Sequence, residues 1–156
     1  MRKLLTTCTA AVLGFFALSA CADTEQIDST AYQVVLEEPT PYTTPQGNTV
    51  LLGGRQHASV VAADGAVSSQ YCTGNAMPAE DGGLANGAGF CTVVEANGDV
   101  IWVWYKITGG GTNTWGAIGG TGEYEGATGG GTSSVVSQGG DGRSAVSKIT
   151  GTITTP

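Results

Sequence analysis

The sequence has little charge, little of it positive, and a single histidine. Only 12% of its 156 residues are charged, and six Lys or Arg stand against thirteen Asp or Glu. No cluster of basic residues is present that could neutralise a nucleic-acid backbone, and a negative net charge repels phosphate groups. These absences exclude nucleic acid as a partner.

Catalytic motifs are also missing. The chain contains no Gly-x-Ser-x-Gly elbow, no His-Glu-x-x-His pair, no calcium-loop spacing and no phosphate loop. Its adjacent carboxylates, such as Glu37 and Glu38, have no histidine or third ligand at a suitable spacing. We therefore expect solvated acids, with neither a metal site nor a cofactor.

The N-terminus has the three parts of an export signal. A basic start precedes a short apolar run over residues 10–18, too short to span a bilayer, which takes about 20 apolar residues. The run ends in Leu18-Ser19-Ala20-Cys21, which resembles a bacterial lipobox, with the lipid attached to Cys21. Ala22 after the cysteine fits sorting to the outer membrane, facing the periplasm. The alternative is cleavage after Ala20 or Ala22, which releases a soluble periplasmic or secreted protein.

This signal predicts where the domain begins and which cysteines belong to it. We expect a signal peptide over 1–20, a flexible tether over 21–30 and one domain over 31–156. Without the signal, four basic residues remain against thirteen acids, a net charge of −9. Cys72 and Cys91 are the cysteines of the domain, and an oxidising compartment favours a disulfide between them. A reactive or metal-binding thiol pair is the alternative, but no histidine lies at ligand spacing.

Glycine is abundant, with 26 residues, and separates short stretches rich in Val, Ile, Thr, Trp and Tyr. No window of the domain repeats apolar residues with helical periodicity over three turns. Short β-rich stretches bounded by turn residues predict an all-β domain. We expect eight strands, over 32–38, 49–62, 66–73, 89–96, 99–108, 113–126, 131–138 and 144–154.

The segment around Asn97-Gly98 predicts a hairpin with a two-residue type I′ turn. That turn pairs Val93 with Trp102 and Cys91 with Trp104, and it places both tryptophans on the face of Cys91. Both faces of this hairpin are apolar, so one fills an interior and the other needs a cover. Core packing on both sides and a subunit interface, hence a homo-oligomer, are equally compatible with the pattern. The segment 73–89 reads as a long loop that the disulfide would close.

Polar residues in two of the predicted strands are the candidates for chemistry. Arg55, His57 and Ser59 alternate onto one strand face, which would bind a carboxylate or move a proton if it faced a lumen. If it faced outward, these would be ordinary solvated side chains. Glu95 shares the predicted face of Trp102 and Trp104, where a carboxylate would have a shifted pKa in a pocket.

The stretch Ile118-Gly119-Gly120-Thr121-Gly122-Glu123-Tyr124-Glu125-Gly126-Ala127-Thr128-Gly129 is the most distinctive in the chain. It resembles the glycine motif of the allene oxide cyclase and dirigent protein barrels, and most closely that of uncharacterised exported bacterial members. The resemblance implies an eight-stranded antiparallel, calycin-like β-barrel with an apolar lumen, trimeric in many plant members. None of the catalytic residues of those families can be matched to this chain.

Three functions follow as hypotheses. The first is an exported, lipid-anchored barrel that binds a small hydrophobic molecule in its lumen, lined by Trp102, Trp104, Trp115 and Tyr124. The second is a cyclase or isomerase that confines a reactive substrate, assisted by Arg55, His57 or Glu95. The third is a structural envelope protein whose barrel is filled by its own side chains.

Overall fold

Nine strands and one short helical turn make up the described part of the chain, residues 22–156 of a computed structural model. The predicted signal peptide and Cys21 lie outside these residues. No helix within 22–156 has the length and apolar character needed to cross a bilayer. The elements are β1 (Asp23–Glu37), β2 (Thr40–Thr43), β3 (Thr49–Ala62), β4 (Val67–Pro78), β5 (Leu84–Val94), β6 (Val100–Ile107), β7 (Thr112–Gly120), the 3-10 turn η1 (Gly122–Tyr124), β8 (Thr128–Gln138) and β9 (Ser144–Thr155).

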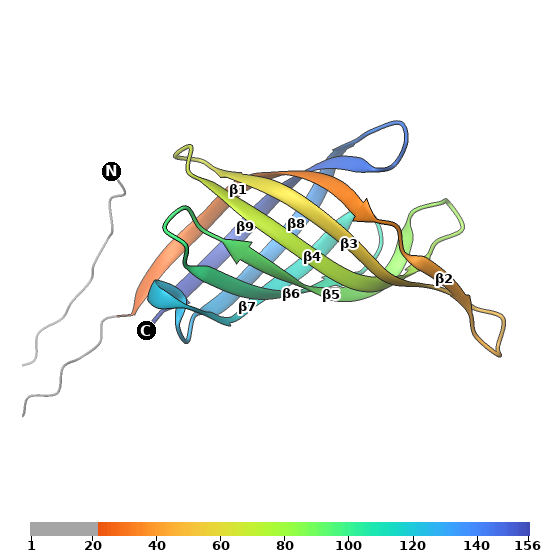
Figure 1. The fold of residues 1–156 in the computed structure, drawn as a ribbon, viewed down its shortest axis with the longest axis horizontal. Coiled ribbons are helices and arrows are strands. Elements are labelled where there is room, and N and C mark those ends of the chain that lie inside the picture. Colours follow the sequence, from red (N-terminus) through yellow and green to blue (C-terminus); the bar gives the residue numbers. More distant parts are fainter. Residues whose placement is uncertain (1–21) are drawn as a thin grey trace, which may run out of the picture.

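Eight of the strands close into an antiparallel barrel, as predicted (Figure 1). Each strand from β3 to β9 pairs with the next, and β1 pairs with β9 on one edge and β3 on the other. The ring order is therefore β1, β9, β8, β7, β6, β5, β4, β3. β2 stands outside it and pairs only with the first residues of β3, so that this hairpin projects beyond the barrel. β2 was not predicted; its Pro41 donates no hydrogen bond and suits an edge strand.

β1 is longer than predicted, because it begins at Asp23 rather than at residue 32. The expected tether over 21–30 is therefore mostly strand. Residues 23–34 pair with β9, and the same strand pairs with β3 from Ser29 onward. Inward and outward side chains alternate along it, as in a strand with one buried face, but Asp, Glu and Gln among them obscured the pattern in the sequence.

The predicted loop over 73–89 is mostly strand as well. β4 continues to Pro78 and β5 starts at Leu84, leaving only residues 79–83 as a connection. Cys72 and Cys91 face each other across this ladder and form the predicted disulfide, which joins two strands rather than the ends of a loop. Glycine and alanine disfavour strands in isolation, and here the ladder on both sides overrides that preference.

The turn after β5 also differs from the prediction. Gly98 has a φ of 90°, while no other residue type in the described chain has a positive φ. A type I′ turn needs two positive values, so the connection is a longer one, closed by hydrogen bonds between Glu95 and Asp99 and from Gly98 to Glu95. Pairing shifts by one residue, to Val93 with Ile101 and Cys91 with Val103. A one-residue shift in register places every side chain of β6 on the face opposite to the predicted one.

Aromatic rings lie against glycines of adjacent or next-but-one strands, which explains part of the glycine content. A Cβ atom on Gly151 would come within 2.7 Å of the Trp115 ring, and one on Gly116 within 2.6 Å of Trp104. Tyr105 covers Gly89 in the same way, with its Cζ 2.6 Å from such a Cβ. Larger residues at these positions would push the rings away from the wall.

The strand predicted over 113–126 ends at Gly120 and is followed by η1, in which Tyr124 is 4% exposed. Tyr124 packs with Ile101, Ala127 and Ile153 near the start of β1 and the end of β9. We call this the packed end of the barrel. The opposite end, surrounded by the connections over 79–83, 108–111 and 139–143, is the loop end.

We predict that Gly89→Ala lowers the free energy of unfolding by about 1–3 kcal/mol, because the added methyl group collides with Tyr105 and the β4 backbone. Urea unfolding followed by circular dichroism measures the change. Gly140→Ala is the control, since a Cβ there meets nothing within 4 Å. Equal stability of the two variants would contradict the close packing.

Candidate functional site: the barrel lumen

A cavity of about 820 Å³ runs through the interior of the barrel. Inward side chains from all eight barrel strands line it, together with residues of the three connections at the loop end. Eight strands enclose just enough room for packed side chains or one small ligand. The volume falls within the range of known small-molecule pockets, about 300–1,000 Å³.

One side of the cavity is apolar. β6 and β7 contribute Ile101, Val103, Tyr105 and Trp115, with Val93 beside them on β5. The Trp115 indole N–H donates to the carbonyl oxygen of Thr132 over 3.2 Å, so the indole is fixed and its polar atom satisfied. Burial raises the pKa of the Tyr105 phenol. This side offers a ligand apolar surface and no charge.

The other side is polar but uncharged. β1, β3, β4 and β9 line it with hydroxyl and carboxamide side chains: Ser29, Gln33, Gln56, Ser68, Gln70 and Ser147. Three of these, Ser29, Ser68 and Ser147, are buried. Hydroxyls and carboxamides both donate and accept hydrogen bonds. This wall suits neutral polar groups.

Charged groups in the lining lie at its two ends. At the packed end, Glu25 and Glu95 line the cavity near Tyr124. The pKa of Tyr124 is raised by burial and further by the carboxylates of Glu95, Glu123 and Glu25. The phenol is therefore held neutral, as a hydrogen-bond donor beside these carboxylates.

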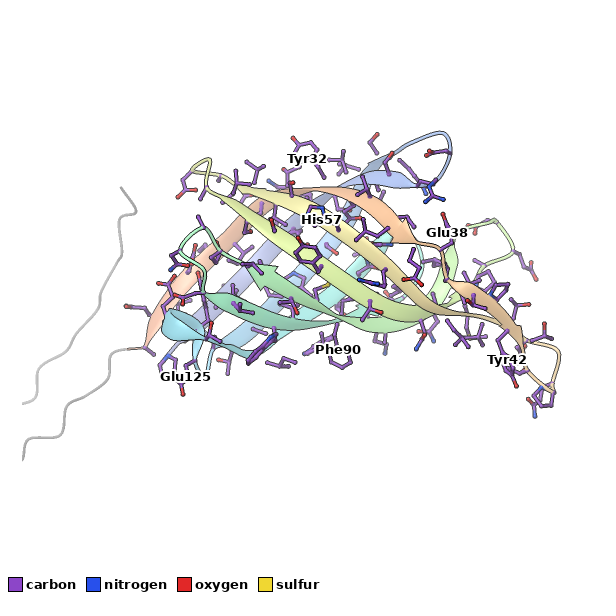
Figure 2. All side chains as sticks on the ribbon, in the orientation of Figure 1. Tyr32, Glu38, Tyr42, His57, Phe90 and Glu125 are labelled. Carbon is purple, nitrogen blue, oxygen red and sulfur yellow. A yellow bond between two sulfur atoms is a disulfide. The ribbon has the colours of Figure 1, made fainter. Side chains whose placement is uncertain are left out.

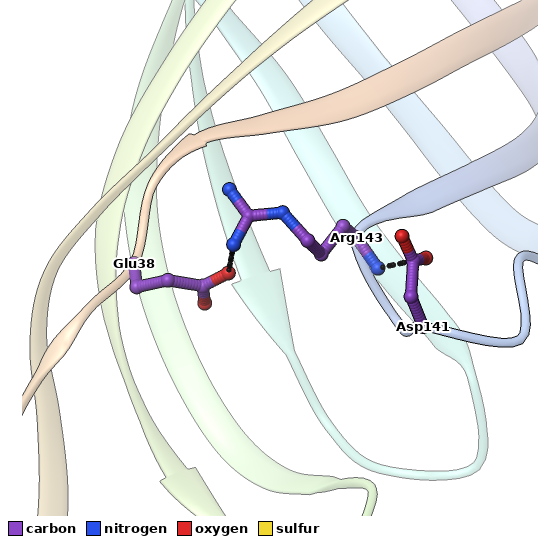
Figure 3. Close-up of polar contacts among 3 residues, drawn as sticks. All are labelled: Glu38, Asp141 and Arg143. Atoms are coloured by element: carbon purple, nitrogen blue, oxygen red, sulfur yellow. Dashed lines mark hydrogen bonds and ion pairs between the residues drawn. The ribbon is translucent and has the colours of Figure 1, made fainter.

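At the loop end, Arg143 is the one cationic residue in the lining formed by residues 22–156. Its guanidinium pairs with Glu38 over 2.5 Å, and its backbone N–H donates to Asp141 over 2.9 Å (Figure 3). The Arg143 carbonyl also accepts from the Val35 N–H over 2.8 Å, which ties this connection to β1. Both ionic side chains are about half exposed, so the pair stabilises the fold little.

The predicted ligand-binding residues divide between the two faces. Trp115, which is 8% exposed, and Tyr124 line the lumen. Trp102 and Trp104 lie on the outer face instead, 43% and 38% exposed, because of the one-residue shift at the Gly98 turn. The sequence pattern did not distinguish the two faces, since both are apolar.

The predicted polar candidates divide in the same way. Glu95 lines the lumen, whereas Arg55 and His57 face outward from β3. His57 lies against Tyr71, with ring centroids 4.7 Å apart, on the surface seen in Figure 2. Arg55 pairs with Glu37 over 3.2 Å. Neither Arg55 nor His57 is among the residues that line the main cavity.

Gln33, Gln56 and Gln70 were missed by sequence reasoning. Gln56 lies between Arg55 and His57, and the inward face of β3 is formed by Gln56, Ala58 and Val60. Ala58 and Val60 were the available signal, because apolar residues that alternate with Arg55, His57 and Ser59 indicate the inward face of a strand.

The outer wall carries an exposed aromatic band over β4 to β6, formed by Tyr71, Phe90, Trp102 and Trp104. Figure 2 shows Phe90 projecting away from the barrel. Nothing in residues 22–156 of the single chain covers this band, so the subunit interface expected for one face of the hairpin stays a prediction. Groups of three or more metal-ligating side chains are absent from residues 22–156.

No family model matches the sequence, and no curated protein does. Two solved structures share the fold. The pterocarpan synthase dirigent protein GePTS1 superposes with a TM-score of 0.56 at 12% identity, covering 86% of each chain. The pterocarpan synthase dirigent protein PsPTS1 has a TM-score of 0.56 at 10% identity, covering 85% of this chain and 95% of its own. The predicted dirigent-like barrel is thus confirmed as a fold.

We predict that stability falls with pH above about 10, the ordinary pKa of tyrosine. The pKa of Tyr124 is higher in the folded than in the unfolded chain, so its contribution is complete below that pH and is lost as pH rises above it. Tyr124→Phe removes this contribution and makes the decline shallower, as urea unfolding from about pH 8 to 11 would measure. Equal slopes for the variant and the parent would contradict the environment described for Tyr124.

Proposed function

We propose that this protein binds a small, largely apolar molecule in the lumen of its barrel. The cavity of about 820 Å³, with Trp115 and the aliphatic side chains of β5 to β7 on one side, is the observation that carries the proposal. A barrel filled by its own side chains, the structural alternative, would have no such space. The dirigent-like fold agrees with ligand binding but does not specify it.

A cyclase or isomerase is the second candidate, and one observation favours it. Tyr124, Glu25 and Glu95 gather at the packed end, where a carboxylate is available as a base and the neutral phenol as a hydrogen-bond donor to a substrate. Arg55 and His57 no longer support this function, because they face outward. A reaction would be indicated by a bound molecule that the wild type converts and Glu95→Gln does not.

The proposal places the barrel in the cell envelope, anchored by a lipid on Cys21. Since β1 begins at Asp23, only Ala22 would separate the acylated residue from the barrel wall. The packed end, where β1 starts, would then lie next to the membrane, and the loop end would point away from it (Figure 1). Ligand exchange would take place through the loop end.

Val60→Trp tests lumen binding. Val60 points into the cavity from β3, so an indole there occupies ligand space. We expect the affinity for N-phenylnaphthylamine, an uncharged apolar fluorophore, to fall at least about tenfold in a fluorescence titration. Val61→Trp is the matched control, because the neighbouring side chain lies on the outer face and is absent from the cavity lining. Equal binding by both variants would place the fluorophore outside the lumen and count against the proposal.

Cys21→Ser tests the anchor. We expect the unaltered protein to enter the detergent phase on phase separation, and its intact mass to include acyl chains. The Cys21→Ser variant should stay in the aqueous phase. Cys8→Ser, which changes the other N-terminal cysteine, should behave as the parent does. A parent protein without acyl mass would overturn lipidation and leave the soluble periplasmic or secreted form.

A further inference from the structure

Three carboxamides lie together on the polar wall of the lumen. Gln33 on β1 and Gln70 on β4 both pair in register with Ala58 of β3, one from each side. Gln56 lies two residues before Ala58 on the same face, and all three glutamines line the cavity. Ala58 is buried and small, so its side chain leaves the space between the carboxamides open.

Among residues 22–156, no protein group is hydrogen-bonded to any of these three side chains. Each carboxamide has one acceptor oxygen and two N–H donors. Polar groups that lose water without gaining a partner destabilise a complex, so a ligand that fills this space must replace the water bonds. A purely hydrocarbon ligand would leave the carboxamide donors and acceptors without hydrogen-bond partners.

The strand arrangement places an apolar surface opposite these carboxamides. In the ring of eight, β7 is four strands from β3 in either direction, so it faces β3 across the lumen. β7 carries Trp115, and β6 beside it carries Ile101 and Val103. A ligand between the two walls meets carboxamides along one edge and apolar surface along the other.

Few charged residues line this space, and all of them lie in the connections or near a strand terminus at its two ends. The charged residues of the lining are Glu25 and Glu95 at the packed end and Asp81 and Arg143 at the loop end, and Arg143 is already paired with Glu38. The cation nearest to Gln33 and Gln56 is Arg143, whose carbonyl oxygen is bonded to the N–H of Val35 on β1, and its guanidinium is paired with Glu38. An ionised group beside the glutamines would therefore lose hydration without gaining an unpaired opposite charge. Both ends of the cavity together contribute more acid than base, which disfavours anions further.

We propose that the lumen selects uncharged amphiphiles that carry carbonyl or hydroxyl groups along one edge, recognised by Gln33, Gln56 and Gln70. This inference rests on the proposed function and adds the chemical class of the ligand. The carboxamides act as the specificity determinants, and the apolar wall supplies affinity without discrimination.

Three fluorophores test the class. Prodan is an uncharged naphthalene ketone whose emission shifts to longer wavelength when its carbonyl accepts a hydrogen bond. N-phenylnaphthylamine is uncharged and has no carbonyl, and anilinonaphthalene sulfonate adds an anionic group to that same skeleton. We expect the wild type to bind the sulfonate at least about tenfold more weakly than the uncharged parent compound.

The variant Gln33→Leu/Gln56→Leu/Gln70→Leu removes the carboxamides at nearly constant volume. We expect its affinity for prodan to fall about tenfold and the emission of bound prodan to move to shorter wavelength, while N-phenylnaphthylamine binds as well or better. Gln26→Leu is the matched control, an exposed glutamine on the outer face of β1. If the triple variant does not fold, Gln56→Leu alone should change prodan binding and emission in the same direction.

Parallel changes for prodan and N-phenylnaphthylamine, or an effect no larger than that of Gln26→Leu, would overturn this inference and leave lumen binding intact. Sulfonate binding as tight as that of the uncharged compound, lost on Val60→Trp, would also overturn it. Failure of the wild type to bind any of the three would overturn the proposed function together with the inference.

Discussion

The double pairing of β1 is the interaction on which the rest of the structure depends. β1 forms one ladder with β9 and another with β3, which converts an open sheet into a closed ring. Closure leaves no free edge among the barrel strands, and it gives every one of them an inside and an outside. The cavity, its two walls and the positions of the aromatic residues all follow from which side each residue takes.

Glycine and aromatic residues act together within this ring. Tyr105 at Gly89 and Trp115 at Gly151 lie close against the wall, so large rings occupy less of the lumen than they would above bulkier neighbours. The packed end is filled around Tyr124, and the cavity extends from there towards the loop end. The space for a ligand thus depends on the glycines that lie beneath these rings.

The polarity of the lumen has a simple arrangement. Carboxamides and hydroxyls line β1, β3, β4 and β9, apolar groups line β5 to β7, and charged groups lie at the two ends. Outside, the distribution differs, because Trp102, Trp104 and Phe90 are exposed on the wall whose inner face is most apolar. These residues belong to the hairpin around Gly98. The sequence showed that both of its faces are apolar, but not which of them faces the lumen.

Composition and pattern by themselves determined that the domain is all-β, that it is strongly acidic, and that Cys72 and Cys91 pair. They also identified Trp115, Tyr124 and Glu95, which line the lumen. Tertiary structure alone decided the sides of Trp102, Trp104, Arg55 and His57, the extent of β1, and the grouping of Gln33, Gln56 and Gln70. The physical reason is that strand alternation has a period of two, so one residue more in the turn at Gly98 exchanges the faces. Where both faces are apolar, only the ladder with the neighbouring strand fixes which of them is inside.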